Sequence, residues 1–541
     1  MLTHHNILDR LDNLISVFMA IGSPALAGYS LAITRLNGRW LARQFSDLDL
    51  PEKSHIPFVI STLQHVPLRI DTSGPFLPSL VALPQNDRYW KTLGTAAHRT
   101  RQWSIPVAMN IIWVLIAFLL TIVDSFVDFD NFIAVPGDAG YSISAAWTYL
   151  LPLVVGWLYV GSQPEANHLR NALADAHRIA YVDTAAGPIL AAQAIGYEST
   201  RAIEVSARHL DHVTADEKKA TPVFNYSRVF IWSQHAEYIL RLYERMGDQR
   251  ITMKHREERS NDGGSVLDRG RVGSELDVVE CRMDEPGVPV GPIRKDSSPR
   301  FPPPFSPYSP FPASPEPSTT SLAAGMYADT YASRRVPSGS SKYDEEASTS
   351  SAEARPAPEK PVFATEVFQR VALATFLALG LQWCTTGASI LIHINTPPKG
   401  VGCRATTFLI FGVAATLAFF LFLLSSVLAH MVRRRSAREE QSVSKGFIGY
   451  VASFARWAGK IVAVANGFGI LITCVMQFAG TYDSCYCSST IFGGNPNGMV
   501  WFVDADVKGS EVYRYWIGGT IMAFGASGLY AFAIYIATAV V

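Results

Sequence analysis

This sequence lacks an excess of charge of either sign. Its 541 residues carry 46 Lys and Arg against 46 Asp and Glu, so the formal net charge is zero. No overall positive field is present to attract a polyanion, and we expect no nucleic-acid partner. Cysteine is also scarce, at six residues, which excludes a small scaffold built on disulfides.

The chain also lacks the usual signatures of catalysis. It contains no GxxxxGK[ST] loop, no HExxH, no GxSxG and no histidine-box series of the membrane desaturase kind. Two Glu-x-x-His pairs, Glu52/His55 and Glu165/His168, have the spacing of metal ligands on a helix, but such pairs arise readily by chance in this composition. We therefore predict no metal, cofactor or catalytic residue, and the sequence favours a protein that is not an enzyme.

Long apolar runs are what the sequence does contain. Residues Ala405–Val432 include no Asp, Glu, Lys or Arg and exceed the roughly 20 residues that a helix needs to cross a bilayer. The run ends at three arginines, Arg433 to Arg435, which predict that this end faces the cytosol. Other predicted spans are Leu14–Ile33, Pro106–Asp124, Ile143–Gly161, Val371–Ile394, Ile461–Ala479 and Trp516–Ala539. The predicted fold is an all-α, polytopic helical membrane protein with about seven transmembrane helices.

The loop charges predict which side each segment faces. Basic residues between 34 and 104 and between 433 and 460 put those segments in the cytosol, with the N-terminus outside and the C-terminus cytosolic, in the plasma membrane or another endomembrane. Ala25-Leu26-Ala27 resembles a signal-peptidase site, so cleavage of the first span stays an alternative. The sequon Asn225-Tyr226-Ser227 falls on the cytosolic side and should not be glycosylated.

Composition divides the chain further. The predicted parts are 1–33 (short outer N-terminus and first span), 34–104 (cytosolic loop with short surface helices), 105–161 (two-span hairpin), 162–253 (cytosolic helical segment), 254–360 (disordered Pro/Ser-rich segment) and 361–541 (four-span bundle with outer cysteine-containing loops). Within 162–253, the amphipathic pattern predicts one apolar helix face made of Val229, Phe230, Trp232, Ile239, Leu240 and Tyr243.

The Pro/Ser-rich segment offers a docking motif. It contains RFPPPFSPYSPFPASPEP, in which polyproline-type conformation suits recognition by cytosolic proteins. Four serines precede proline and are phosphorylation candidates: Ser298, Ser306, Ser309 and Ser314. A plain solvated linker is the alternative.

Few polar side chains fall inside the predicted spans. They are Asn110, Gln382, Asn466 and Gln477, and we expect them to make hydrogen bonds between helices. A proton- or sodium-coupled carrier normally needs more ionisable groups at membrane depth. The cysteines in the outer loops are Cys403, Cys485 and Cys487, and we predict a disulfide from Cys403 to either of the other two. The alternatives are three free thiols, or a metal clip, for which three sulfurs are one short of the usual four ligands.

Several segments carry a resemblance to a known family. These are GSPALAGYSLAITRLNGRW, RQWSIPVAMNIIWVLIAFLLTIVDSF, QWCTTGASILI, GVGCRATTFLIFG and YDSCYCSS. The chain resembles an uncharacterised family of large fungal multi-pass membrane proteins with no established activity, which implies an architecture and a fungal source but no reaction. We predict an integral membrane protein, in contact with the lipid bilayer, that acts as a non-catalytic interaction or sensing platform. The alternative is a transporter or channel for a small neutral solute.

Overall fold

The computed structural model describes residues 14–48, 55–70, 76–97, 142–160, 166–184, 187–193, 202–205, 216–217, 222–266, 362–396, 400–437, 443–483 and 509–539, with the single residues 116 and 120. Two compact units are distinguished, one made of Met1–Leu267 with Lys360–Val541 and the other of Asp268–Glu359. All described residues belong to the first unit.

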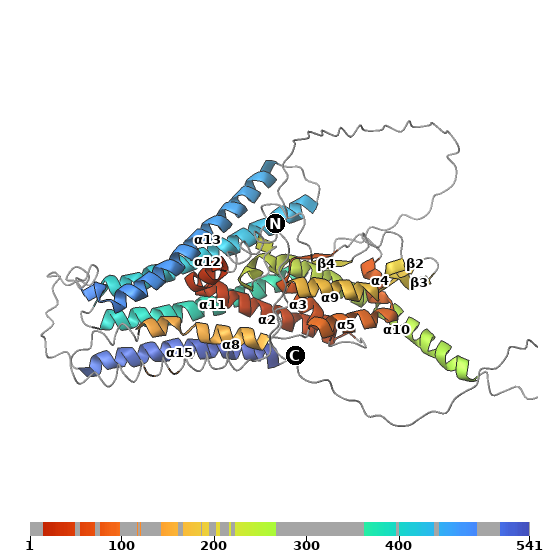
Figure 1. Ribbon diagram of the computed structural model, residues 1–541, viewed down its shortest axis with the longest axis horizontal. Helices are drawn as coiled ribbons and strands as arrows, with labels where there is room; N and C mark the ends of the chain where they lie inside the picture. The colour runs from red at the N-terminus through yellow and green to blue at the C-terminus, as the bar shows by residue number, and fades with distance from the viewer. Residues whose placement is uncertain are drawn as a thin grey trace, which may run out of the picture. The chain divides into compact units, whose positions relative to one another are not determined.

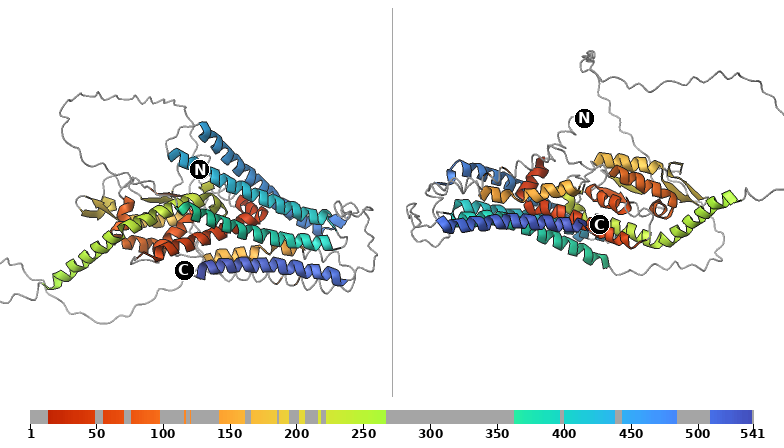
Figure 2. Two further views of the ribbon diagram at one scale, coloured as in Figure 1. Left: turned by 180° about the vertical axis from the view of Figure 1, so that it is seen from behind. Right: turned by 90° about the horizontal axis from the view of Figure 1, so that it is seen from below.

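Four long helices come from the C-terminal third of the chain (Figure 1). They are α11 (Val362–Asn395), α12 (Cys403–Ala437), α13 (Val443–Phe478) and α15 (Gly509–Ala539). Each holds a stretch long and apolar enough to cross a membrane, so the described part of the chain has four such helices. α11 packs against both α12 and α15, and α12 packs along α13 (Figure 2).

The stretch before the third of these helices differs from the prediction. Residues 433–460 were expected to form a cytosolic connection, whereas α12 continues to Ala437 and α13 already begins at Val443. The aromatic side chains of Phe447 and Tyr450 point outward near the start of α13, 70% and 69% exposed. The predicted start of this span at Ile461 is therefore corrected to an earlier position, because the positive charges that set the predicted boundary can also lie on a long helix near its end.

The first predicted span is bent. Helix Leu14–Gly22 and helix α2 (Pro24–Ser46) meet at about 100° on either side of Ser23. Proline has no backbone N–H and is tolerated at the first position of a helix, so Pro24 starts a new helix and cannot continue the old one. A straight span over Leu14–Ile33 is therefore corrected to a broken one, and α2 continues well beyond Ile33.

Shorter elements complete the described part. They are α3 (His55–Thr62), η1 (Leu63–His65), β1 (Leu68–Ile70), α4 (Phe76–Ala82), η2 (Pro84–Asn86), α5 (Asp87–Ala97), α8 (Leu150–Val160), α9 (Ala166–Arg178), β2 (Tyr181–Thr184), β3 (Gly187–Leu190), η4 (Ala191–Gln193), β4 (Ile203–Val205), η7 (Pro222–Phe224), α10 (Asn225–Val266) and η8 (Thr481–Asp483). The apolar helix Ser142–Trp157 lies on the predicted third span but is shorter than a full crossing. Of the predicted second span, only residues 116 and 120 are described.

Four short strands were not predicted. β1 pairs with β4 in an antiparallel sheet, with Leu68 opposite Val205, and β2 pairs with β3, with Tyr181 opposite Leu190. Gly187, at φ 109°, turns the chain into β3, a backbone conformation that suits glycine. The fold is therefore mainly helical, as predicted, but not all-α in its described part.

One hydrophobic core joins segments that the sequence analysis kept apart. Its members come from the end of α2, from α3 to α5, from α9, from β1, β2 and β4 and from α10, and include Leu41, Phe45, Trp90, Ile203 and Tyr243. We call this packed region, which is made of the described residues within 55–97, 166–205 and 231–246, the α/β domain. The six side chains predicted for the apolar face of α10 are all buried.

α10 is longer than predicted. Residues 254–266 were assigned to the disordered segment but form the C-terminal part of this helix. The sequence MKHREERS continues it with Lys, Arg and Glu, which favour helix without needing a buried face. Residues 267–361, including the rest of the Pro/Ser-rich segment and its four serines, lie outside the described residues.

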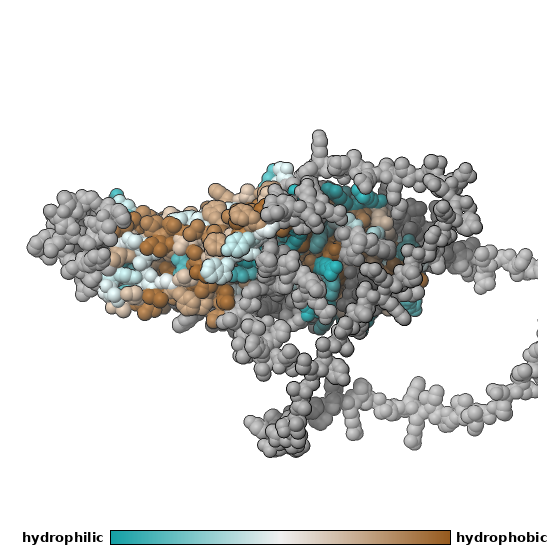
Figure 3. All heavy atoms as spheres, turned by 90° about the horizontal axis from the view of Figure 1, so that it is seen from above, coloured by the Kyte–Doolittle hydropathy of each residue, from teal (hydrophilic) through white to brown (hydrophobic). Residues whose placement is uncertain are grey.

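The long helices expose their apolar side chains. Phe376, Ile410, Val475 and Phe532 are 74%, 60%, 68% and 59% exposed, and Figure 3 shows hydrophobic side chains covering much of the surface over these helices. The described residues of the α/β domain include no large hydrophobic side chain that is exposed to this degree.

Candidate functional site

The break at Ser23 is held by hydrogen bonds to three other helices. The backbone N–H of Ala25 donates to Gln382 Oε1 at 3.0 Å, and Ser23 Oγ donates to the Ala415 carbonyl at 3.1 Å. Asn466 Nδ2 donates to the carbonyls of Gly22, at 2.7 Å, and Phe411, at 3.0 Å. Two backbone groups at the bend thus find side-chain partners in α11 and α13, as buried backbone groups require, and the Ser23 side chain adds a contact with α12.

Gln382 and Asn466 make the hydrogen bonds between helices that their positions predicted. Gln382 is fully buried, and its Nε2 donates to the Gly412 carbonyl at 3.1 Å and to Thr416 Oγ1 at 2.8 Å. Gln477 Nε2 lies 2.9 Å from His393 Nε2, which also lies 2.6 Å from Ser142 Oγ. Asn110 is outside the described residues.

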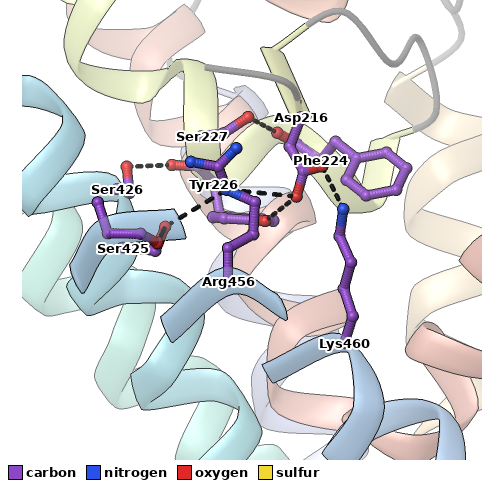
Figure 4. A network of polar contacts seen from close by, with 9 residues as sticks. Asp216, Phe224, Tyr226, Ser227, Ser425, Ser426, Arg456 and Lys460 are labelled. Carbon is purple, nitrogen blue, oxygen red and sulfur yellow. Dashed lines mark hydrogen bonds and ion pairs between the residues drawn. The ribbon is translucent and has the colours of Figure 1, made fainter. Parts of the chain in front are cut away.

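A buried carboxylate connects α10 with α13. Asp216, whose side chain is 1% exposed, accepts a hydrogen bond from the Tyr226 hydroxyl at 2.5 Å and pairs with Lys460 Nζ. Arg456 Nε lies 3.9 Å from the same carboxylate (Figure 4). Burial, with the nearby Asp216, raises the pKa of Tyr226 well above its usual range, so this hydroxyl keeps its proton and donates.

Two serines of α12 extend this network. Ser425 Oγ donates to the Ala452 carbonyl of α13 at 2.7 Å, and Arg456 Nε lies 3.4 Å from Ser425 Oγ. Ser426 Oγ donates to the Tyr226 carbonyl of α10 at 2.8 Å (Figure 4). Three helices are therefore joined by polar contacts at one place, which we call the junction: Asp216, Glu217, Tyr226, Ser425, Ser426, Arg433, Arg456 and Lys460.

A second ion pair lies beside the first. Arg433 Nη2, near the end of α12, lies 2.8 and 2.7 Å from the two carboxylate oxygens of Glu217. Burial raises the pKa of Glu217, and Arg433 opposes that rise. The pair fixes the short 216–217 segment against α12, as the Asp216 contacts fix it against α13.

A pocket of about 360 Å³ opens next to this ion pair. Its polar lining includes Gln64, and its ionisable lining is Arg69, Glu217, Arg228, His235 and Arg433. Burial lowers the pKa of Arg228 to about 10 and that of His235 to about 4, so at neutral pH the arginine is charged and the histidine is not. Three guanidinium groups face one carboxylate, and this excess of positive charge suits a small anion. The volume lies in the range of ordinary ligand pockets.

The junction was not found by sequence reasoning. Asp216 and Glu217 are two of many polar residues between 206 and 221, and their partners lie more than 200 positions away. One signal was present: Arg456 and Lys460 stand four residues apart and so share a helix face. They were used only to assign a side of the membrane, whereas cations on one face of a long apolar helix also predict a buried acidic partner.

The predicted cysteines and metal pairs are described only in part. Cys403 begins α12, and both Cys485 and Cys487 lie outside the described residues. Cys384 and Cys474 are free thiols within long helices. Glu52 and Glu165 are not described, while His168 Nε2 lies 3.2 Å from the Ala96 carbonyl. No group of three possible metal ligands occurs among the described residues.

Comparison with known proteins leaves the site as the main guide to function. No protein-family model, no curated protein and no solved structure matches this chain. The broken helix, the junction and the pocket next to it are therefore the features that bear on function.

Proposed function

We propose that this chain is an integral multi-pass membrane protein that acts without catalysis as an interaction or sensing platform. The observation that carries the proposal is the position of Arg433. It ends the apolar stretch of α12, lines the pocket and pairs with Glu217. An anion that binds in the pocket competes with Glu217 for this guanidinium. Its binding therefore changes the contact of α12 with Glu217 and, through the adjacent Asp216, the contact of α13 with the same segment.

Membrane insertion is supported by the exposed apolar side chains of α11, α12, α13 and α15. Soluble proteins rarely expose an apolar surface of this size to water. We propose the seven-span arrangement, with the N-terminus outside and the α/β domain in the cytosol. Alkaline carbonate extraction should leave the chain in the membrane pellet. Release into the supernatant contradicts membrane insertion.

The sidedness has its own test. Asn225 is 3% exposed and its Nδ2 donates to Thr34 Oγ1 at 2.9 Å, so both burial and a cytosolic location argue against its glycosylation. A glycosidase should leave the mass of the protein unchanged. A mass shift that disappears in Asn225→Gln would place the α/β domain outside.

The sensing role is tested at Arg69, the exposed arginine of the pocket. Inorganic phosphate and ATP, titrated into the purified protein in detergent, should raise its unfolding temperature and change hydrogen exchange at the junction end of α13. Arg69→Gln should weaken both effects at least several-fold. Arg88→Gln, an exposed arginine on α5 outside the pocket, is the matched control and should leave both unchanged. Equal responses in the two variants contradict an anion-sensing pocket.

We further propose that the Pro/Ser-rich segment recruits cytosolic proteins and that phosphorylation at Ser298, Ser306, Ser309 and Ser314 regulates this. In support, α10 ends at Val266 and α11 begins at Val362, so the segment can be removed without cutting either helix. Replacing Asp268–Glu359 with a Gly/Ser linker should abolish binding of purified SH3 or WW domains. Four Ser→Ala substitutions should keep binding and remove its response to a proline-directed kinase.

A transporter or channel for a small neutral solute is the alternative, and the bent helix at Ser23 favours it, because broken helices are typical of carriers. Against it, the polar groups at the break already bind Gln382 and Asn466. Flux of glycerol or urea in reconstituted vesicles, abolished by Gln382→Leu, would support transport over sensing.

The disulfide and the family also remain proposals. We propose that Cys403 pairs with Cys485 or Cys487, which non-reducing peptide mapping distinguishes. We also propose that the chain belongs to the fungal family that it resembles. Three of the five segments that carry the resemblance fall on α2, α11 and the start of α12, and residues Gly22, Gln382 and Gly412 from them take part in holding the break.

A further inference from the structure

A second basic groove lies between α2 and α11, away from the junction. Its volume is about 430 Å³, and it is lined by Leu36, Arg39, Trp40, Arg43, Gln44, Glu366, Gln369, Arg370 and Leu373. None of these residues lines the 360 Å³ pocket. On α2 the lining residues recur every three or four positions, which puts them on one helix face.

α2 and α11 run antiparallel, and the lining residues give the groove between them a polar end and an apolar end. Trp40 Nε1 donates to Glu366 Oε2 at 2.6 Å, and Arg370 Nη1 donates to Asn37 Oδ1 at 2.7 Å. Further along the pair, Ala25 meets Gln382. Arg39 and Arg43 therefore lie toward one end of the groove, while Leu36 and the exposed Leu373 lie toward the other.

Arg370 lies at a depth that suits a lipid headgroup. It stands ten residues before Gly380, the middle of the apolar stretch Thr365–Asn395. At about 1.5 Å per residue this is about 15 Å along the helix, half of a hydrocarbon core of about 30 Å. One turn further into this stretch, Leu373 and Phe376 are exposed and face outward.

The guanidinium groups of the groove have unused donors. Arg370 is 8% exposed, and its Nη2 is buried and has no hydrogen-bond partner among the described residues. The same is true of Arg39 Nε. The guanidinium carbon of Arg370 lies 4.2 Å from the centre of the Trp40 ring, which fixes its position. The carboxylate of Glu366 already accepts from Trp40, so buried donors remain available to an incoming acceptor.

We propose that this groove binds an anionic phospholipid of the cytosolic leaflet whose headgroup carries a phosphomonoester. Three arginines against one glutamate leave two positive charges in excess, and a phosphomonoester supplies about 1.5 to 2 negative charges where a diester supplies one. Arg39, Arg43 and Arg370 hold the phosphate, and the acyl chain lies along Leu36 and Leu373. Basic pockets next to membrane helices on the cytosolic side recognise headgroups in this way. The proposal rests on the membrane insertion proposed above, which carbonate extraction tests separately.

The test uses the full chain in neutral detergent with short-chain lipids. Dioctanoyl phosphatidylinositol 4-phosphate should raise the unfolding temperature, whereas dioctanoyl phosphatidylcholine should not. Arg43→Gln, at an exposed position, should fold normally and reduce the apparent affinity at least five-fold, and Arg39→Gln should act in the same direction. Arg88→Gln is again the matched control and should keep the full response.

Three results overturn the proposal. One is an equal response to dioctanoyl phosphatidylserine, which lacks a phosphomonoester. Another is an equal response to inorganic phosphate alone, which means that the acyl chain adds nothing and the ligand is not a lipid. The last is an unchanged affinity in Arg43→Gln and Arg39→Gln. Since Arg69→Gln affects only the other pocket, failure here is distinguishable from failure of the sensing proposal.

Discussion

The four long helices and the α/β domain use the same kinds of side chain in opposite ways. Trp90 in the α/β domain is completely buried, whereas Trp457 on α13 is 61% exposed. The domain puts its large apolar groups inside, as a protein in water must. The long helices bury small residues against one another, such as Ala374, Ala378 and Ala463, and although some large side chains, such as Phe419 and Trp516, are also buried, many others are turned outward. Close packing by small residues is typical of helices surrounded by lipid, where burying an apolar group gains little.

The first prediction compares these two tryptophans. Trp90 packs against Tyr89 and Tyr243, and its Nε1 donates to the Leu80 carbonyl at 3.2 Å. Trp90→Ala should destabilise the α/β domain by about 3–5 kcal/mol. Trp457→Ala should cost less than about 0.5 kcal/mol in detergent. Hydrogen exchange of α5 and of α13 measures the two changes in stability. Equal losses of stability in the two variants would contradict the contrast between the two regions.

A second prediction concerns the junction, where the two regions meet. Asp216→Asn leaves Arg456 and Lys460 without their carboxylate, and removing one partner of a buried ion pair costs about 3–5 kcal/mol. The matched control is Asp175→Asn on α9, where Asp175 pairs with Arg178 but both side chains are 67–75% exposed. That change should stay within about 1 kcal/mol. Unfolding temperature in detergent is the measurement, and similar shifts in both variants contradict a buried junction.

A third prediction concerns packing at the break. A Cβ on Gly467 would lie 2.7 Å from the Phe18 carbonyl oxygen, which is backbone and cannot move aside. Gly467→Ala should therefore push the two helices apart and cost about 1–3 kcal/mol. Gly469 lies on the same helix, and a Cβ added there would meet no described atom within 4 Å, so Gly469→Ala should be neutral or slightly stabilising. The order of the two unfolding temperatures is the test.

The smallest expected effect is the pH dependence of stability that His65 of the α/β domain contributes. Burial, with the nearby Arg228, lowers the pKa of His65 to about 3, so the folded protein keeps this ring neutral. The unfolded chain binds a proton near pH 6.5. Between these values the unfolded state holds more protons, so stability falls as pH falls below about 6.5, by at most about 1.4 kcal/mol per pH unit. His65→Asn should reduce this slope in unfolding measurements between pH 5.5 and 7.5, while His235, whose pKa burial also lowers, keeps its own share of the slope. An unchanged slope would show that His65 does not contribute.

Much of the fold was predictable because apolar length and periodicity are local properties. α11, α12, α13 and α15 follow from uninterrupted apolar runs, and the buried face of α10 follows from its helical spacing. The bend at Ser23 was not predicted, because the mean hydropathy of a run carries no information about the direction of the helix axis. The strands were missed because three or four residues are too few for an alternating pattern.

The candidate site was predictable only in its polar helix residues. Gln382 and Asn466 stood out as the rare amides in apolar runs, and both bind other helices. The junction was not predictable in this way, since Asp216 and Lys460 are 244 positions apart and nothing local marks the aspartate as buried. Charge complementarity between distant segments needs the fold before it can be recognised.

The broken helix also constrains how the protein is made. The hydrogen-bond partner of the Ala25 N–H is Gln382, which is synthesised 357 residues later. The partner of the Gly22 carbonyl is Asn466, which is synthesised 444 residues later. At about 5–20 residues per second, the ribosome needs roughly 20 to 70 s to reach Gln382 after making Ala25. Throughout that time two backbone groups at the bend lack their final partners. The nascent N-terminal helices must therefore be kept hydrated or held by an insertion factor until the C-terminal third emerges.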